Sequence, residues 1–277
     1  MTRIAATAMI VLAAALSMAS AQTSSPSSQQ GSPMTPVSPD VLQDLAPTGK
    51  LRAAINLGNM VLAQKDPATG RPKGITADLA HELGRRLHVE VELVPFDAAG
   101  KVFEAVKSGN LDVMFLAIEP VRANEIAFTA PYVIIEGVYM VPQDSKITRV
   151  EDVDRDGVRI GVNKNSAYDL YLTRTLKHAT LMRSDDGIAQ FVKDKLEAAA
   201  GVKQPLVAFA SKNPGVRVLD GRFMEIRQAM GTPKERGDAG SRYLAAFVEE
   251  MKASGFVANA LERSNQPDAM VAPPATA

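Results

Sequence analysis

Hydrophobic residues in the first half of the chain follow two different patterns. Residues 51–56 form a short apolar run typical of a buried strand, whereas 76–87 repeats apolar residues every three or four positions, as an amphipathic helix does. The pattern then predicts a strand over 89–94, a helix over 99–107 and a strand over 111–116. Strands that alternate with helices in this order pair in parallel, so the segment predicts a doubly wound α/β layer.

The same rhythm restarts in the second half of the chain. The pattern predicts a strand over 158–162, helices over 166–177 and 185–194, and a short strand over 196–199. A last amphipathic helix is expected over 242–252, where the apolar residues share one face. Two lobes of roughly a hundred residues each match the usual size of a domain. The expected fold class is therefore α/β, with two doubly wound α/β lobes.

The first 21 residues have the pattern of a secretory signal peptide. Arg3 gives a positive start, residues 4–16 are an apolar run, and Ala19-Ser20-Ala21 is the small-residue pattern that a signal peptidase cleaves. The apolar run is too short to span a bilayer as a helix. We therefore expect export and cleavage after Ala21.

The segments that flank the expected lobes are poor in apolar residues. Residues 22–46 are rich in serine and proline, and residues 266–277 end in APPATA. Such segments bury too little apolar surface to offset the entropy lost on ordering. We expect a flexible linker over 22–46 and a disordered tail over 266–277.

Composition and charge exclude several functions. The 31 basic and 31 acidic residues balance, so no basic surplus is available to neutralise a nucleic-acid backbone, and we expect no nucleic-acid partner. The absence of cysteine excludes disulfides and thiolate catalysis. His81 begins a zinc-binding pattern, but Arg85 occupies the position of the second histidine. We expect no metal and no cofactor.

One segment carries a specific family pattern. Residues 111–132, LDVMFLAIEPVRANEIAFTAPY, combine Asp112 near the start of a strand, a Pro-x-Arg ending at Arg122 and a closing Phe-Thr-Ala-Pro-Tyr. This segment resembles the bacterial family 3 extracellular solute-binding proteins, which are type II periplasmic binding proteins of ABC importers. The pieces KLRAAIN, GITADLAHELGRRL, VKSGN and VRIGVNKNSAY agree in order, so the resemblance covers 48–264.

The resemblance implies an architecture and a set of partners. Two crossover strands, near 137–141 and 223–227, would join the lobes and leave a ligand cleft between them. Lobe 1 would hold 47–139 plus 226–265, and lobe 2 would hold 140–225. The implied partners are a small-molecule ligand and an ABC transporter permease in the inner membrane. The implied location is the periplasm, and a monomer is the default state.

The resemblance also implies ligand-binding residues. The arginine of the family pattern, here Arg122, pairs bidentately with a ligand carboxylate, which suits a planar guanidinium. Alternatively, Arg122 caps a helix or pairs with Glu119 or Glu125. The turn containing Asn165 and Ser166 would offer N–H groups and a hydroxyl to an anion, because a helix begins there. Ser166 as a simple N-cap is compatible with this role.

Three departures from the family pattern bear on the ligand. The loop before Arg122 is about two residues shorter and lacks hydroxyls, which leaves the N–H of Ala117 as a donor. The aspartate that pairs with a ligand ammonium is replaced by Gly201-Val202-Lys203, and we expect Lys203 to repel an ammonium. The aromatic residue that usually follows the first strand is replaced by Leu57-Gly58-Asn59-Met60, in which Asn59 is the candidate for binding the ligand.

These departures favour a ligand that keeps a carboxylate but lacks a conventional α-amino group. Glu119 and Glu136 remain as alternative partners for a cation, so an amino acid stays open.

Three functions follow as hypotheses. The first is a receptor that closes on a small polar carboxylate-bearing solute, an amino acid or related organic acid, and delivers it to an ABC transporter. The second is an enzyme on the same scaffold, like cyclohexadienyl dehydratase, with Glu119, Glu136 or Lys203 as the acid. The third is a sensory binding module without transport.

Overall fold

The computed structural model describes residues 37–266 and 268–276. The expected signal peptide over 1–21 and most of the expected linker lie outside the described residues. Within the described part, no helix is long and apolar enough to cross a membrane.

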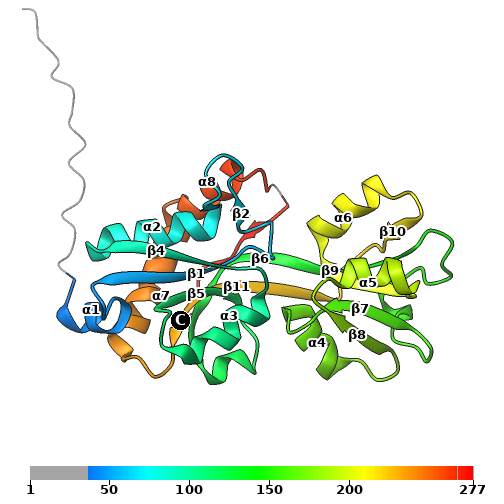
Figure 1. Cartoon of the computed structure of the whole chain (residues 1–277), viewed down its shortest axis with the longest axis horizontal. Helices are drawn as coiled ribbons and strands as arrows, with labels where there is room; N and C mark the ends of the chain where they lie inside the picture. The colour runs from blue at the N-terminus through cyan, green and yellow to red at the C-terminus, as the bar shows by residue number, and fades with distance from the viewer. Residues whose placement is uncertain (1–36, 267, 277) are drawn as a thin grey trace, which may run out of the picture. The chain divides into compact units, whose positions relative to one another are not determined.

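The body is built on one sheet that runs through both lobes (Figure 1). In the order of the sheet, the first four strands are β4 (Glu90–Phe96), β1 (Lys50–Asn56), β5 (Val113–Ala117) and β11 (Met224–Pro233). The first three lie in lobe 1, and β11 connects the lobes. The next four, from the crossover into lobe 2, are β6 (Ile126–Pro142), β9 (Ala198–Val202), β7 (Arg159–Asn163) and β8 (Thr180–Ser184). The short strands β10 (Val216–Val218) and β12 (Met270–Val271) also pair with β6, and β2 (Gln64–Lys65) pairs with β3 (Pro72–Lys73).

The outer strands at both ends of the sheet are parallel, as the alternation of strands and helices predicts. In lobe 1, β1 pairs in parallel with β4 and β5, and in lobe 2, β7 pairs in parallel with β8 and β9. The central strands β11 and β6 are antiparallel to each other. Each lobe is therefore a doubly wound α/β unit, and this expectation is confirmed.

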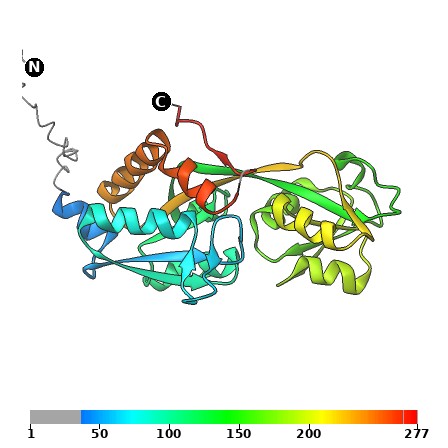
Figure 2. The same cartoon turned by 90° about the horizontal axis from the view of Figure 1, so that it is seen from above.

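Strands β6 and β11 pass from one lobe to the other, as the second view shows (Figure 2). Strand β6 pairs with β11 up to Gly137, and from the same residue onward it pairs with β9. A Cβ on Gly137 would lie 2.7 Å from the Met224 side chain and 3.0 Å from that of Phe223, so a larger residue at this crossing point would displace a neighbouring side chain. The expected crossing at 137–141 falls within β6, and the one at 223–227 falls at the start of β11, whereas the residue boundaries of the lobes stay a prediction.

Helices cover both faces of the sheet in each lobe. Lobe 1 carries α2 (Ile75–Leu87), α3 (Ala99–Ala105), α7 (Asp238–Ala253) and α8 (Phe256–Arg263). Lobe 2 carries α4 (Ala167–Thr175), α5 (Gly187–Asp194) and α6 (Lys203–Lys212).

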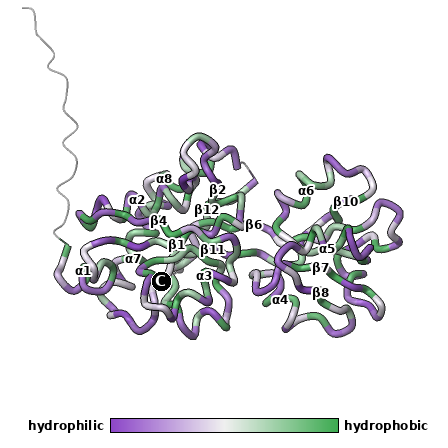
Figure 3. The backbone as a smooth tube through the Cα atoms, in the orientation of Figure 1, coloured by the Kyte–Doolittle hydropathy of each residue, from purple (hydrophilic) through white to green (hydrophobic). Residues whose placement is uncertain are grey.

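Side chains alternate across the buried strands of this sheet. Along β5, Val113, Phe115 and Ala117 enter one core, while Met114 and Leu116 enter the other. Strand β6 is coloured mainly as hydrophobic in Figure 3, as a strand buried between layers should be.

The expectation of a flexible linker is wrong for its last residues. Pro39–Leu45 form helix α1, whose N-cap Ser38 accepts a hydrogen bond from the N–H of Val41. Val41 and Leu45 are buried, and the Asp44 carboxylate accepts the N–H of Gly240 at 2.8 Å. This helix therefore packs against α7 and belongs to the folded body.

The expectation of a disordered tail is wrong for residues near the C-terminus. Strand β12 pairs with Val133 and Ile134 of β6, and the N–H of Ala272 donates to the carbonyl of Tyr132. Ala272 is buried, so the tail covers a strand edge that would otherwise be exposed.

Truncation after Gln266 is expected to lower the free energy of unfolding by about 1–3 kcal/mol, because it removes buried apolar surface and exposes the β6 edge. For a chain of this size the melting temperature should fall by roughly 2–10 °C. Thermal melts measure the difference, and truncation after Ala275 is the matched control. Equal melting temperatures for the two truncations would contradict the packing of β12.

Candidate functional site

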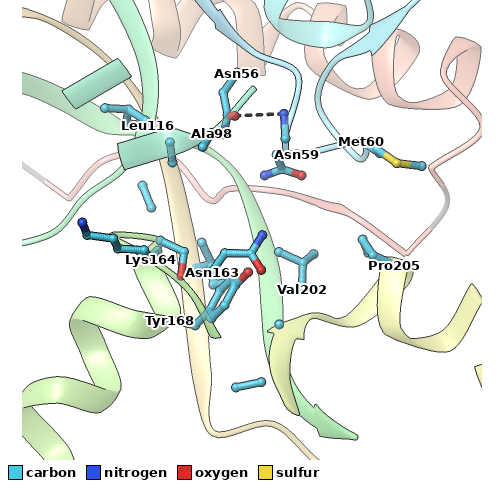
Figure 4. A pocket seen from close by; sticks show the side chains of 18 of the residues that line it. Asn56, Asn59, Met60, Ala98, Leu116, Asn163, Lys164, Tyr168, Val202 and Pro205 are labelled. Atoms are coloured by element: carbon cyan, nitrogen blue, oxygen red, sulfur yellow. Dashed lines mark hydrogen bonds between the residues drawn. The ribbon is translucent and has the colours of Figure 1, made fainter. Parts of the chain in front are cut away.

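A cavity of about 320 Å³ lies between the two lobes. Lobe 1 contributes residues from the ends of β1 and β5 and the start of α3, and lobe 2 contributes residues from β7, α4, β9 and α6. Figure 4 shows the side chains of the two lobes facing each other across the open space. A volume of this size accommodates a small organic molecule.

Arg122 is the buried cation of this cavity. It lies in the single-turn 3-10 helix Arg122–Asn124, just after β5, and is 1% exposed. Its Nη1 donates to the carbonyl of Ala117 at 3.2 Å, and its Nη2 donates to the carbonyl of Asn165 in lobe 2 at 2.9 Å. The guanidinium therefore contacts both lobes while it lines the cavity.

The charge of Arg122 has no carboxylate partner among the described residues. Two of its five N–H groups are used on backbone carbonyls, and Nε is buried without a partner. Burial lowers the pKa of Arg122 to about 10, opposed by the carboxylate of Glu119. The group stays charged at neutral pH, and an anionic ligand would satisfy its free donors.

The turn before α4 is an N-cap that borders the cavity. The hydroxyl of Ser166 accepts the N–H of Asp169 at 3.1 Å, so the simple capping role expected for Ser166 is present. Ser166 also lines the cavity, next to Ala167 and Tyr168, the first helical residues, whose N–H groups have no partner within the helix. The start of α4 can therefore still attract negative charge.

Asn165 serves the contact between the lobes instead of lining the cavity. Its backbone adopts a left-handed conformation with φ of 59°, and its N–H donates to the Asp169 carboxylate at 2.8 Å. That N–H is therefore not available to a ligand. Its carbonyl accepts the hydrogen bond from Arg122, and this bond joins the two lobes.

Two further candidates, Ala117 and Asn59, line the cavity. Ala117 ends β5, and its carbonyl holds Arg122 in place. Asn59 follows β1, and its Oδ1 is buried without a hydrogen-bond partner. A buried acceptor without a partner is costly unless a ligand supplies a donor.

Glu119 is not a lining residue. Its carboxylate, in a side chain that is 2% exposed, forms an ion pair with Arg174 of α4. This pair links lobe 1 to lobe 2, and Glu119 forms its ion pair with Arg174 and not with Arg122.

Lys203 also lies outside the lining. It is the first residue of α6, and its Nζ donates to the carboxylate of Glu136 at 2.8 Å, while Arg222 binds the other oxygen of that carboxylate. The expectation that Lys203 repels a ligand ammonium is therefore wrong, because Lys203 pairs with Glu136 outside the cavity lining. Gly201 and Val202 line the cavity in its place.

The ion pairs of Glu136 predict a pH-dependent stability. Lys203 and Arg222 hold the pKa of the Glu136 carboxyl below its usual value of 4.5, so the pairs stabilise the fold above that pH. We expect Glu136→Gln to cost about 0.5–1 kcal/mol at neutral pH, since the group is partly exposed. The cost should shrink as the pH falls below 4.5 through the lower pKa of the folded state.

Urea unfolding at several pH values measures this cost, with exposed Glu235→Gln as the control. A cost for Glu136→Gln that is the same at every pH would contradict the ion pairs.

Two further lining residues, on β11 and α4, were not among the residues predicted from the sequence. Gln228 of β11 is 6% exposed and lines the cavity, and a polar residue between Ile226 and Ala229 was the available signal. Tyr168 is buried on the cavity wall, and burial raises its pKa to about 12. Both side chains can form hydrogen bonds to a ligand without adding charge.

Three of the described acidic residues line the cavity, and all three are exposed to solvent. Asp97 pairs with Lys101 at 2.9 Å with a side chain that is 74% exposed. Asp185 and Asp186 are exposed as well, and Asp186 caps α5 by accepting the N–H groups of its first turn. In the described part of the chain, no three histidine or acidic side chains are grouped so that they could hold a metal ion.

Two α/β lobes, joined by β6 and β11 and separated by a cavity, define the fold of a type II periplasmic binding protein. Residues 60–264 match the bacterial extracellular solute-binding proteins, family 3, and the chain belongs to this family.

Individual relatives are distant. A glutamine-binding protein from Geobacillus stearothermophilus is 23% identical over 231 residues, which cover 80% of this chain and 87% of that protein. A mutant of an arginine-binding protein from T. maritima superposes with a TM-score of 0.68 at 22% identity, covering 81% of this chain and 99% of that one.

An ancestral amino acid-binding protein, described as a precursor of cyclohexadienyl dehydratase, superposes with a TM-score of 0.66 at 22% identity and covers 80% of this chain and 98% of that one. At these identities the solved structures establish the fold.

Proposed function

We propose that the protein is a periplasmic receptor that captures a small carboxylate-bearing solute by closing its two lobes and delivers it to an ABC transporter permease. The observation that carries the proposal is Arg122. This buried cation lines the cavity with free donors and has no carboxylate partner in the described part of the chain. A glutamine-binding relative in the same family supports a small carboxylate-bearing solute.

Closure follows from contacts that the ligand makes with both lobes. To change the closed fraction from 1% to 99%, a ligand must favour the closed form by ~5.5 kcal/mol. Arg122 of lobe 1 and the start of α4 in lobe 2 both border the cavity, so one carboxylate could reach groups on both lobes. A ligand held by one lobe alone would give no such preference.

A thermal-shift screen of the secreted chain, residues 22–277, tests the receptor function. The probes are amino acids, carboxylates without an amino group, polyamines and prephenate. A carboxylate at 100 times its Kd should add ~2.7 kcal/mol to the free energy of unfolding. Stabilisation by polyamines alone would contradict the proposal.

The dehydratase alternative receives no support from its candidate acids. Glu119, Glu136 and Lys203 are each held in ion pairs and do not line the cavity. Incubation with prephenate, followed by NMR, is expected to return prephenate unchanged beyond its spontaneous reaction. Faster loss of water and carbon dioxide would establish the enzyme instead.

A further inference from the structure

The cavity is asymmetric in charge between its interior and its mouth. Arg122 is 1% exposed, whereas the carboxylates that line the cavity, Asp97, Asp185 and Asp186, are all exposed. The two acids nearest to Arg122 in sequence pair with other cations, Glu119 with Arg174 and Glu125 with Lys107. The interior therefore offers a partner for a negative charge and no carboxylate for a positive one.

An α-amino acid does not fit this distribution of charge. Its ammonium is attached one carbon from the carboxylate, so it must enter the interior when the carboxylate binds Arg122. Neutral acceptors offset the desolvation cost of a buried ammonium only in part, and the rest of that cost remains when no carboxylate pairs with it. The aspartates at the mouth stay toward solvent: Asp97 pairs with Lys101, Asp186 accepts N–H groups of α5, and Asp185 is exposed.

The uncharged polar groups of the interior indicate what fits in place of the ammonium. Asn59 presents a buried Oδ1 without a partner, and the buried Gln228 also lines the cavity. The wall around them is apolar and includes Leu116, Val202 and Leu206. An amide oxygen accepts a hydrogen bond from a hydroxyl at no cost in buried charge.

We propose that the cavity selects a carboxylic acid whose second polar group is an uncharged donor such as a hydroxyl, with an apolar chain, over the α-amino acid of the same skeleton. The inference rests on the proposed function, because it takes Arg122 as the partner of the carboxylate. It assigns the substrate class of that same cavity.

Calorimetry with matched ligands tests the inference on the purified chain. Each of three sets contains a hydroxy acid, an amino acid and an unsubstituted acid on one carbon skeleton. The first set is phenyllactate, phenylalanine and phenylpropanoate, and the other two sets are built on the skeletons of leucine and of alanine. The hydroxy acid is expected to bind at least about tenfold more tightly than the amino acid in the set that fits best. An amino acid that binds as tightly as its hydroxy acid in every set would overturn the inference.

A charge placed at the cavity wall should reverse the preference. Val202 lines the cavity and is the N-cap of α6 without a side-chain hydrogen bond, so aspartate is compatible with its backbone. Val202→Asp is expected to shift the ratio of affinities toward the amino acid by at least about tenfold. Val192→Asp, which adds the same charge on an exposed position of α5, should leave the ratio unchanged. A Val202→Asp ratio equal to that of the wild type would overturn the inference.

Different results would overturn the receptor function and the substrate class. Tight binding of amino acids that is lost in Arg122→Met would overturn the substrate class and leave the carboxylate receptor standing. Binding that is indifferent to Arg122→Met, or no binding of any of the nine acids at millimolar concentration, would overturn the receptor and the substrate class together.

Discussion

Replacing Arg122 by methionine is expected to weaken the binding of a carboxylate ligand by at least about 100-fold, which corresponds to ~2.7 kcal/mol. The guanidinium is the buried cation of the cavity, and methionine keeps much of its length without its donors. Charge-assisted hydrogen bonds that are shielded from water contribute about 1.5–3 kcal/mol each, so the loss of a bidentate pair accounts for the change.

The stability of the ligand-free protein separates a binding role from a structural one. In Arg122→Met an unpaired buried charge disappears, while two backbone carbonyls lose their donor. These effects oppose each other, and we expect the free energy of unfolding to change by less than about 1 kcal/mol. Arg263→Met, on an exposed ion pair with Asp78, is the control for the loss of charge. A loss above about 3 kcal/mol with unchanged affinity would show that Arg122 is structural.

Replacing Gly100 by leucine is expected to weaken ligand binding by about 10- to 100-fold, which is ~1.4–2.7 kcal/mol. Gly100 is the second residue of α3 in lobe 1, and a Cβ there would lie 2.8 Å from the Cβ of Asn165 in lobe 2. A leucine side chain would therefore act as a wedge between the lobes. The ligand must then close the lobes against this steric cost, although the lining side chains stay in place.

Calorimetry and small-angle scattering on the same samples measure the wedge. Gly100→Leu should bind weakly and stay more extended with ligand, while the exposed Glu104→Leu on the same helix should behave as the wild type. Full affinity for Gly100→Leu would contradict a cavity that depends on contact between the lobes.

The fold was predictable where the hydrophobic residues follow a clear local pattern. Helix α2 repeats apolar residues along one face, and strands β1 and β5 are largely apolar runs, because these residues face a core within the same lobe. Helix α1 was hidden in a serine- and proline-rich segment, although Ser38-Pro39 is a good helix start. Strand β12 is two residues long and exists only because a distant edge of β6 is open to it.

The site was predictable to the extent that local sequence marks it. The flanking pattern identified Arg122, and the helix start identified Ser166, and both line the cavity. Glu119 and Lys203 were misplaced because their partners, Arg174 and Glu136, are 55 and 67 residues away in sequence. Nothing local indicates which way a long charged side chain turns when its partner comes from another element.

A crystal structure of the protein with its tightest carboxylate ligand would show directly whether Arg122 binds the carboxylate. We expect the ligand carboxylate to lie between the lobes, with an oxygen about 2.7–2.9 Å from Nε of Arg122 or from an Nη with a free N–H. A ligand whose carboxylate points to the mouth, with Nε of Arg122 still unpartnered, would contradict this expectation.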